Sequence, residues 1–352
     1  MCESAPKPVF RPFQEIGVDL GTATVLIYVK GKGIMLREPS VIALVKGTGE
    51  VRAVGEEAYK MLGRTPGSIV TVRPMRDGVI ADYTLTEKML KAFVRRVITG
   101  PSRFLGHNVM VCVPSGVTEV EKRAVLQAVR EVGARRALLI EEPLAAAIGA
   151  GLSVTEPTGS MVVDVGGGTT DVAVISLGGV VVAESLRIAG NEFDEAIVRF
   201  VRHKESMLIG DRTAEEIKLR VGAASVKSPG EVGSFEVRGR DIGSGLPKTA
   251  TVTTDDVVEA LRDPLEKIAA GVQRVLETAP PELVSDIIDK GIIMTGGGAL
   301  LRNFDDLLRQ TTGIPVAVAE NAVDCVALGT GKALSMTELL EDALVSDRFL
   351  RR

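Results

Sequence analysis

Three glycine-rich turns stand at the ends of short apolar runs and could bind phosphate groups. They are Gly21-Thr22, Gly166-Gly167-Gly168-Thr169-Thr170 and Gly296-Gly297-Gly298. Glycine lets the backbone approach a ligand closely and leaves its N–H groups open to phosphate oxygens. One such turn alone could be an ordinary hairpin or helix start. Three of them favour a nucleotide, because ligands of open α/β sheets bind at the carboxyl ends of strands.

Three acidic residues near these turns could supply metal binding and proton transfer. Asp19 and Asp164 each close a predicted strand just before a glycine turn, where a carboxylate can hold Mg²⁺ through its water shell. The alternative for each is a turn-capping aspartate. Glu142 lies where a predicted strand passes into a helix, and it could deprotonate an attacking water. Its alternative is an acid that stabilises the helix N-terminus.

The elements that position these residues come from an internal duplication. The segments that begin at Ile16 and Met161 both predict strand, glycine turn, strand, glycine turn and strand, and their aspartates lie 145 positions apart. Alternating strands and helices follow each segment. The sequence therefore predicts two similar α/β domains that face each other, each with an insertion, at residues 43–75 and 193–256.

The later elements have recognisable boundaries. We expect strands at 109–113, 137–140, 291–294 and 314–318, and helices at 117–132, from Pro143, at 254–278, around 301–308 and at 323–335. Thr118 and Glu121 predict a capping box at the start of the 117–132 helix. The buried stripe of that helix is expected at Val120, Ala124, Ala128 and Val132. Residues 337–352 predict a charged helical end.

Composition excludes several classes of function. The chain has 352 residues, a net charge of −4, 3% aromatic residues and no tryptophan, so we expect no nucleic-acid partner. Three cysteines and two histidines are too few for a disulfide framework or a zinc site. The run Gly329-Thr-Gly-Lys332 lacks the upstream glycine of a Walker A loop, and no G-x-G-x-x-G follows the first strand. With no signal peptide or spanning segment recognised, we expect a cytoplasmic location.

One short apolar pair suggests contact with a lipid surface. Phe104 and Leu105 lie in a loop flanked by proline, serine and glycine, with Arg103 beside them. Apolar side chains at a loop tip with a nearby cation suit a membrane surface. A second apolar and basic patch lies in residues 7–13. The alternative for both is packing onto the protein's own core.

The motifs together resemble one family. Asp19-Leu-Gly-Thr22, Asp164-Val-Gly-Gly-Gly-Thr-Thr-Asp171 and Thr295-Gly-Gly-Gly-Ala-Leu300 are similar to the actin, heat-shock chaperone and sugar-kinase ATPases. Within that superfamily the chain resembles the MreB/Mbl family of bacterial actin homologues. The segments that carry this closer resemblance are Arg73–Asp82, Glu141–Gly149, Gly159–Asp164, Thr278–Ile288 and Glu320–Gly331. The resemblance runs from about Ile16 to Leu334.

The resemblance implies a nucleotide site made by separate stretches of chain. By resemblance, Thr22, Ala23 and Thr24, together with Gly166, Gly167, Gly168 and Thr169, contact the phosphates of ATP or GTP. Asp19 and Asp164 hold the Mg²⁺ water shell, Glu142 is the hydrolytic glutamate, and Thr169 helps to place the water. Glu215, Glu216, Ile217 and Lys218, with Gly296, Gly297, Gly298, Ala299 and Leu300, lie on the adenosine side. From the residues alone, Glu215 and Lys218 are equally a solvated helical pair behind a capping box at Thr213 and Glu216.

The resemblance also implies an actin-like fold divided into four subdomains around the nucleotide. Their expected ranges are 1–42, 76–156 and 326–352 for IA, 43–75 for IB, 157–192 and 257–325 for IIA, and 193–256 for IIB. Phe104 and Leu105 match a membrane-insertion loop, which implies a protein at the inner face of the plasma membrane. Thr24 and Val25 depart from the family's usual Asn-Thr, which puts the hydrolysis rate in question.

The implied function is a filament-forming ATPase that associates head to tail with itself and organises cell-wall synthesis for rod shape. Its partners by resemblance are the membrane and the wall-elongation machinery. The alternative is a monomeric ATPase of the same superfamily, either a chaperone-type domain or a small-molecule kinase. A chaperone would also need a peptide-binding domain, for which we expect no room after the ATPase core. A kinase would need a base for its acceptor hydroxyl, and the sequence offers no candidate besides Glu142.

Overall fold

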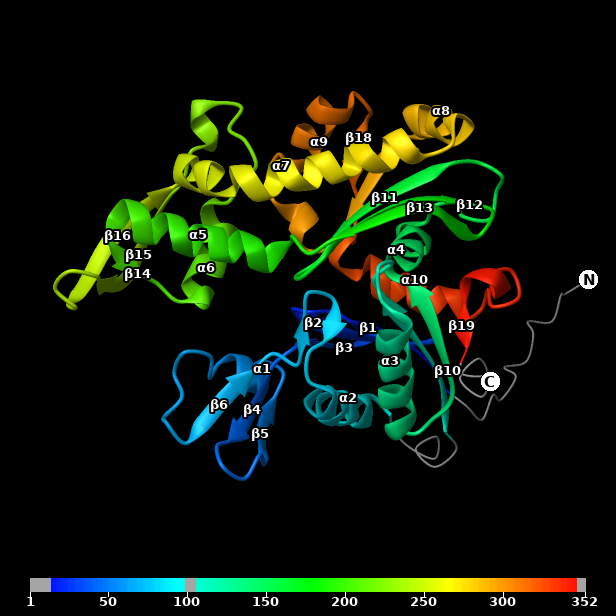
Figure 1. The fold of residues 1–352 in the computed structure, drawn as a ribbon, viewed down its shortest axis with the longest axis horizontal. Helices are drawn as coiled ribbons and strands as arrows, with labels where there is room; N and C mark the ends of the chain where they lie inside the picture. The colour runs from blue at the N-terminus through cyan, green and yellow to red at the C-terminus, as the bar shows by residue number, and fades with distance from the viewer. Residues whose placement is uncertain (1–13, 99–105, 347–352) are drawn as a thin grey trace, which may run out of the picture.

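Two sheets of similar topology form the centre of the molecule (Figure 1). The computed structural model describes residues 14–98 and 106–346. The first sheet has the order β19-β10-β9-β1-β2-β3. Its strands are β1 (Gln14–Leu20), β2 (Thr24–Val29), β3 (Gly33–Pro39), β9 (His107–Val113), β10 (Ala134–Glu141) and β19 (Val345–Ser346). The second sheet has the order β13-β12-β11-β17-β18. Its strands are β11 (Ser160–Val165), β12 (Thr170–Ser176), β13 (Gly179–Leu186), β17 (Ile292–Thr295) and β18 (Val316–Val318).

The pairing of the strands confirms the duplication. β1, β2 and β3 form an antiparallel meander, and β9 and β10 continue the sheet in parallel from β1. In the second sheet, β11, β12 and β13 form the same meander, and β17 and β18 continue in parallel from β11. In both sheets the first strand is therefore central and ends at a glycine turn. Each of these strands is buried along most of its length, as expected for strands covered on both faces.

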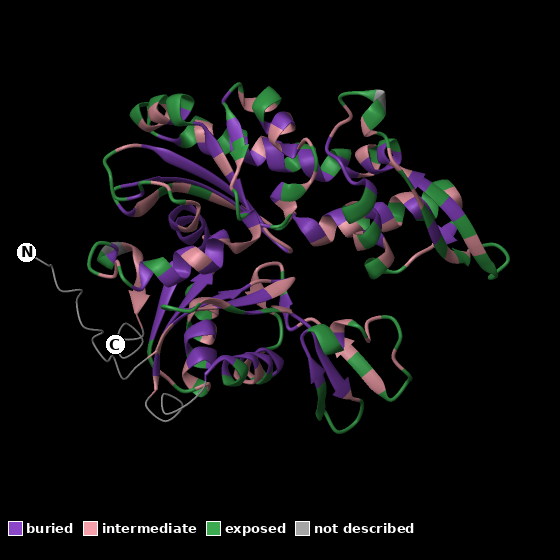
Figure 2. Cartoon of the chain, turned by 180° about the vertical axis from the view of Figure 1, so that it is seen from behind, coloured by how far each residue is buried: buried purple, intermediate pink, exposed green. Residues whose placement is uncertain are grey.

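Helices cover the outer faces of the two sheets and fill the space between them. α4 (Glu142–Ala150) and α10 (Cys325–Ala333) lie between the sheets, as Figure 1 shows. The outer helices of the first half are α2 (Tyr83–Val97) and α3 (Glu119–Glu131). Those of the second half are α7 (Thr254–Thr278), α8 (Pro281–Lys290) and α9 (Phe304–Thr312), while α5 (Gly190–Glu205) and α6 (Asp211–Val221) belong to the second insertion. Figure 2 shows buried residues along both sheets and along the helices between them.

The two insertions each form a small sheet at the same side of the molecule (Figure 1). Residues 42–72 form β4 (Ile42–Val45), β5 (Val51–Val54), α1 (Glu56–Tyr59) and β6 (Ile69–Val72), followed by a short hairpin, β7 (Met75–Arg76) and β8 (Val79–Ile80). The second insertion contains α5, α6, β14 (Met207–Leu208), β15 (Ser234–Asp241) and β16 (Pro247–Thr253). The exact division into four subdomains stays a prediction.

Several boundaries agree with the sequence because local signals set them. α7 spans the expected 254–278, beginning after a capping box at Thr253 and Asp256. α3 has the predicted capping box, in which the Thr118 side chain accepts from the Glu121 N–H. The predicted helix around 301–308 is α9, but it begins only at Phe304 and leaves Leu301 outside.

Other local predictions were wrong. Of the expected stripe on α3, Ala128 is fully buried as predicted, but Val120 is 77% exposed, and the other buried residues of the helix are Val125, Leu126 and Val129. The described part of the C-terminal segment is not an α-helix: it holds a short 3₁₀ turn and β19, which pairs with β10. α6 begins after Gly210, so Thr213 lies inside it and forms no capping box. α8 was not predicted from the pattern.

Candidate functional site

A cavity of about 640 Å³ lies between the two halves and gathers most of the predicted site. The predicted residues that line it are Asp19, Thr22, Ala23, Thr24, Glu142, Asp164, Gly166, Gly167, Gly168, Thr169, Glu215, Lys218, Gly296, Gly297, Gly298 and Leu300. Three predicted positions do not line it. Ile217 and Ala299 are buried in the core of the second half, and Glu216 is exposed without lining the cavity. Their contact with a ligand stays a prediction that this geometry does not favour.

The first two glycine turns face each other closely enough to require glycine. A Cβ atom added at Gly167 would lie 2.4 Å from the Cβ of Ala23, and one at Gly168 would lie 2.5 Å from Oγ1 of Thr22. Real Cβ atoms do not approach other atoms this closely. The two turns therefore form one continuous rim, to which both halves of the duplication contribute. A phosphate chain held there would touch both halves at once.

A third segment, at Gly78, contacts both glycine turns. The backbone N–H of Gly78, which has a φ of 78°, donates to Oγ1 of Thr22 at 2.9 Å. A Cβ at Gly78 would lie 2.7 Å from Cγ2 of Thr169. Gly78 thus packs against both turns, and only glycine suits its left-handed backbone and its close contacts.

Four buried acids lie at and below the floor of the cavity. Asp19 and Glu142 are each 9% exposed, Asp164 is 5% exposed and Asp171 is 1% exposed. Burial raises the pKa of Asp19 and of Asp164 to about 7 each, and raises the pKa of Asp171 to about 6. Burial raises the pKa of Glu142 well above its ordinary value, and the charges of Asp171, Asp19 and Asp164 raise it further. A carboxyl group with a pKa near neutrality is suited to proton transfer.

The contacts of the two strand-end aspartates fit a divalent cation. Asp164 accepts a hydrogen bond from the Thr295 hydroxyl at 2.8 Å, and Asp19 accepts one from the Cys112 thiol at 3.4 Å. Neither aspartate forms an ion pair with Lys, Arg or His among the residues that the structure describes. Buried carboxylates without a cationic partner are costly, and oxygen ligands at a cavity floor are what Mg²⁺ prefers. The residues present therefore fit a hydrated Mg²⁺ ion.

Cys112 is a neighbour that the sequence did not predict. Its Sγ lies 3.4 Å from Oδ1 of Asp19 and 4.0 Å from Oε1 of Glu142. Burial, together with the charges of these two acids, raises the pKa of the thiol well above its ordinary value. Cys112 is therefore a neutral donor that helps to orient the two carboxylates.

A lysine and an aspartate fix the second glycine turn to the insertion that follows it. Lys218 on α6 pairs with Asp194 at 2.8 Å and donates to the backbone oxygen of Gly190 at 2.9 Å. The N–H groups of Gly190 and Asn191 donate to the backbone oxygens of Gly166 and Gly167 at 3.1 and 2.8 Å. The hydrogen bonds from the start of α5 thus fix the backbone of the second glycine turn, and Lys218 in turn fixes the start of α5.

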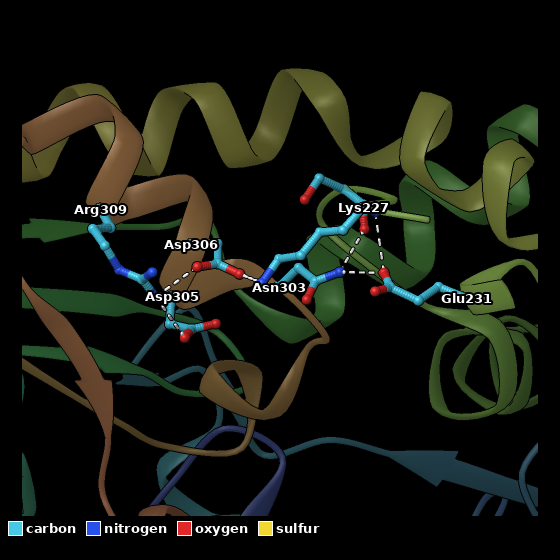
Figure 3. A network of polar contacts seen from close by, with 7 residues as sticks. Lys227, Glu231, Asn303, Asp305, Asp306 and Arg309 are labelled. Atoms are coloured by element: carbon cyan, nitrogen blue, oxygen red, sulfur yellow. Dashed lines mark hydrogen bonds and ion pairs between the residues drawn. The ribbon is translucent and has the colours of Figure 1, made fainter. Parts of the chain in front are cut away.

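The far wall of the cavity is braced by a polar network behind the third turn (Figure 3). Lys227 forms an ion pair with Asp306, which also pairs with Arg309 at 2.5 Å. The Asn303 amide donates to Oε2 of Glu231 at 2.9 Å. Figure 3 shows these side chains joining α9 to the segment that follows α6. The network holds the α6 side of the cavity against the turn that begins at residue 296.

Arg302 also joins these segments, and it lines the cavity. It donates to the backbone oxygens of Gly222 and Glu231 at 3.0 and 3.1 Å, and to the hydroxyl of Thr254 at 3.2 Å. Further lining residues that the sequence did not single out are Tyr59, Arg73 and Asp194. Arg73 and Gly78 stand in a segment that carried the family resemblance, which was the one signal that could have found them.

The raised pKa values predict how stability responds to pH without a metal. An aspartate in the unfolded chain has a pKa of about 3.9 and loses its proton near that pH. In the folded protein, Asp19 and Asp164 keep their protons to a higher pH, so folding is linked to proton binding between the two pKa values. The contribution of these two groups to the free energy of unfolding is therefore fully present below about pH 4, and it is lost as pH rises through about 7. Tm measured without divalent ions should fall over this range, and Mg²⁺ with nucleotide should reduce the fall. The Asp164→Asn variant should show a shallower slope, and a wild-type Tm that rises with pH would contradict the assignment.

The predicted membrane pair, Phe104 and Leu105, lies outside the described residues, as does the patch at residues 7–13. None of the helices in residues 14–98 and 106–346 combines the length and the apolar character that spanning a bilayer requires.

Comparisons with known proteins agree with this fold. The family model described as MreB/Mbl protein matches residues 13–342. The chain is 53% identical over 338 residues to the cell shape-determining protein MreB of Escherichia coli K12, covering 95% of this chain and 96% of that protein. It is 50% identical over 327 residues to the cell shape-determining protein Mbl of Bacillus subtilis 168, covering 93% and 97%. The crystal structure of Spiroplasma citri MreB5 bound to ADP superposes with a TM-score of 0.87 at 38% identity, covering 94% of this chain and 98% of that one. The chain belongs to the MreB/Mbl family and has its actin-like fold.

Proposed function

We propose that this protein is an actin-like cytoskeletal ATPase that binds Mg²⁺-ATP and assembles head to tail into filaments. The observation that supports this most directly is the joined rim of two glycine turns above buried carboxylates, in one cavity between duplicated halves. That arrangement suits a polyphosphate with a divalent ion. GTP is the alternative nucleotide, and competition between ATP and GTP in a binding titration would separate them.

The residues of the cavity have distinct proposed roles. The N–H groups and hydroxyls of Thr22–Thr24 and Gly166–Thr169 bind the phosphates. Asp19 and Asp164 hold the water shell of Mg²⁺, which supplies charge neutralisation to phosphoryl transfer when bound. Glu142 accepts a proton from the attacking water, and Thr169 helps to place that water. Glu215, Lys218 and the turn from Gly296 to Leu300 hold the adenosine side.

The cellular role we propose follows the cell shape-determining relatives. Filaments of this protein would lie at the inner face of the plasma membrane and organise cell-wall synthesis to maintain rod shape, through contacts with the elongation machinery. Slow hydrolysis would limit the lifetime of the filaments. The protein would be cytoplasmic and peripheral to the membrane.

Electron microscopy of the purified protein on a lipid monolayer tests this function. Mg²⁺ with ATP should give filaments on the lipid, and the control without nucleotide should give few or none. Dispersed particles under all nucleotide and salt conditions would contradict the proposal and favour a monomeric ATPase of the same superfamily.

The membrane contact has its own test. Replacing both Phe104→Ser and Leu105→Ser should abolish co-sedimentation with liposomes, because the apolar anchor is lost while the cavity is untouched. ATP binding, measured in parallel, should be unchanged. Full retention on liposomes would move the anchor elsewhere, and the residue 7–13 patch would be the next to test.

A further inference from the structure

One tyrosine joins the two inserted segments across the cavity. Tyr59 ends α1, and its hydroxyl donates a hydrogen bond to Oε2 of Glu215 on α6, 156 positions later. The guanidinium carbon of Arg212 lies 5.9 Å from the centroid of the Tyr59 ring, within reach of a cation–π contact. Both Tyr59 and Glu215 line the cavity.

Tyr59 carries the side-chain contacts that join the two insertions in the described structure. Side-chain hydrogen bonds and ring contacts between residues 42–72 and 190–253 all run through Tyr59, as far as the structure describes these two segments. Burial and the neighbouring Glu215 raise the pKa of the Tyr59 hydroxyl, so it remains a protonated donor at neutral pH. A hydrogen bond to a charged acceptor is stronger than one between neutral groups.

We infer that Tyr59 and Glu215 form a clasp that slows the release of nucleotide from the cavity. A ligand that leaves between the two insertions must first separate them, and so must break this contact. Tyr59 is thus a positioning residue: it holds Glu215, which faces the ligand, and it keeps the two insertions together. This inference rests on the proposed nucleotide function and adds the control of nucleotide residence to it.

The test is the dissociation rate of a fluorescent ADP analogue, measured by stopped flow with Mg²⁺ at a protein concentration too low for assembly. Tyr59→Phe keeps the ring beneath Arg212 and removes only the donor to Glu215. We expect dissociation to become faster by about tenfold, because a hydrogen bond to a charged group is lost. The association rate should change by less than about threefold, since the effect is on escape.

A matched control separates this effect from the loss of any tyrosine hydroxyl. Tyr83→Phe removes a buried hydroxyl that has no hydrogen-bond partner in the described structure, and Tyr83 does not line the cavity. Its dissociation rate should equal that of the wild type. Tyr59→Lys should restore slow release, because an ammonium group can again donate to Glu215. The Tm of Tyr59→Phe should lie within about 4 °C of the wild type, as the loss of one hydrogen bond allows, which excludes a general loss of stability.

The outcomes distinguish the clasp from the proposed function. If the wild type retains the ADP analogue and Tyr59→Phe releases it at the wild-type rate, the clasp is wrong and the nucleotide function stands. If Tyr59→Lys releases it as fast as Tyr59→Phe, the donor is not what matters, and the clasp is again wrong. If the wild type does not bind the analogue or unlabelled ATP, the proposed function fails and the clasp fails with it.

Discussion

Replacing Glu142 by glutamine will slow ATP hydrolysis by about a hundredfold or more while leaving ATP binding within about threefold of the wild type. Glu142 begins α4, directly after β10, and its carboxyl group faces the cavity that holds the glycine turns. Its raised pKa suits a group that takes a proton from water. Glutamine keeps the shape of the side chain and cannot accept that proton, so the loss should fall on the chemical step.

The neighbouring residue provides a close control for this experiment. Glu141 is also a carboxylate, but it precedes the helix and does not line the cavity. Glu141→Gln should therefore hydrolyse ATP at nearly the wild-type rate. Phosphate release by Glu142→Gln at the wild-type rate would falsify the role of Glu142 as the base. A drop in both variants would indicate damage to the β10–α4 junction instead.

The same substitution should change stability in the opposite direction to activity. Three buried acids line this floor and Asp171 lies below it, and the charges of Asp171, Asp19 and Asp164 act on Glu142. Removing one ionisable group relieves part of that repulsion. The Tm of metal-free Glu142→Gln at pH 8 should therefore exceed that of the wild type. Such a gain is expected where residues needed for activity lower the stability of the fold. An unchanged Tm would mean that Glu142 is already neutral in the metal-free protein.

Replacing Gly329 by alanine will destabilise the fold by about 3 kcal/mol or more, or prevent folding. Gly329 lies on α10 where that helix crosses α4 between the two sheets. A Cβ there would lie 1.7 Å from the backbone oxygen of Ala145, and one at Gly149 would lie 1.8 Å from that of Cys325. These are backbone atoms, which cannot move aside without separating the helices.

Two opposing effects decide the sign of this change. Alanine favours a helix over glycine by about 1 kcal/mol, which would stabilise an exposed position. The overlap with the Ala145 carbonyl outweighs this gain, because relieving it must shift α4, which packs against both sheets. Urea denaturation of Gly329→Ala measures the difference. Gly67→Ala is the control, because no atom lies within 4 Å of a Cβ at Gly67. Equal midpoints for Gly329→Ala and the wild type would contradict this packing.

Part of the site was predictable because its signals are local. The two glycine turns, with Asp19 and Asp164 before them, are each contained in a few consecutive residues. Apolar runs between glycines specify a strand, a turn and a second strand without help from the rest of the chain. The repetition of this pattern predicted two α/β domains that face each other, and the family resemblance implied the nucleotide cleft between them. The capping box at Thr118 was predictable for the same reason, since its hydrogen bonds join residues three positions apart.

The buried face of α3 and the secondary structure of the C-terminal segment were not predictable from such local signals. Val120 falls on a plausible apolar stripe, yet packing against the first sheet selects Val125 and Val129 instead. A helix with apolar residues on more than one side has no unique buried face until a partner covers it. The charged segment after residue 337 suggested a helix, but Val345 and Ser346 within it pair as a strand with β10, some 200 positions earlier.

The sequence by itself determined the duplicated architecture, the family and the glycine turns that line the cavity, because each depends on neighbours along the chain. Only the tertiary structure decided that Cys112 lies between Asp19 and Glu142, that Gly78 supports both turns, and that Tyr59 reaches Glu215. These contacts join residues that lie far apart in the sequence and carry no periodic or local signal. Their geometry exists only after strands and helices have packed, since packing, rather than local preference, sets which side chains meet.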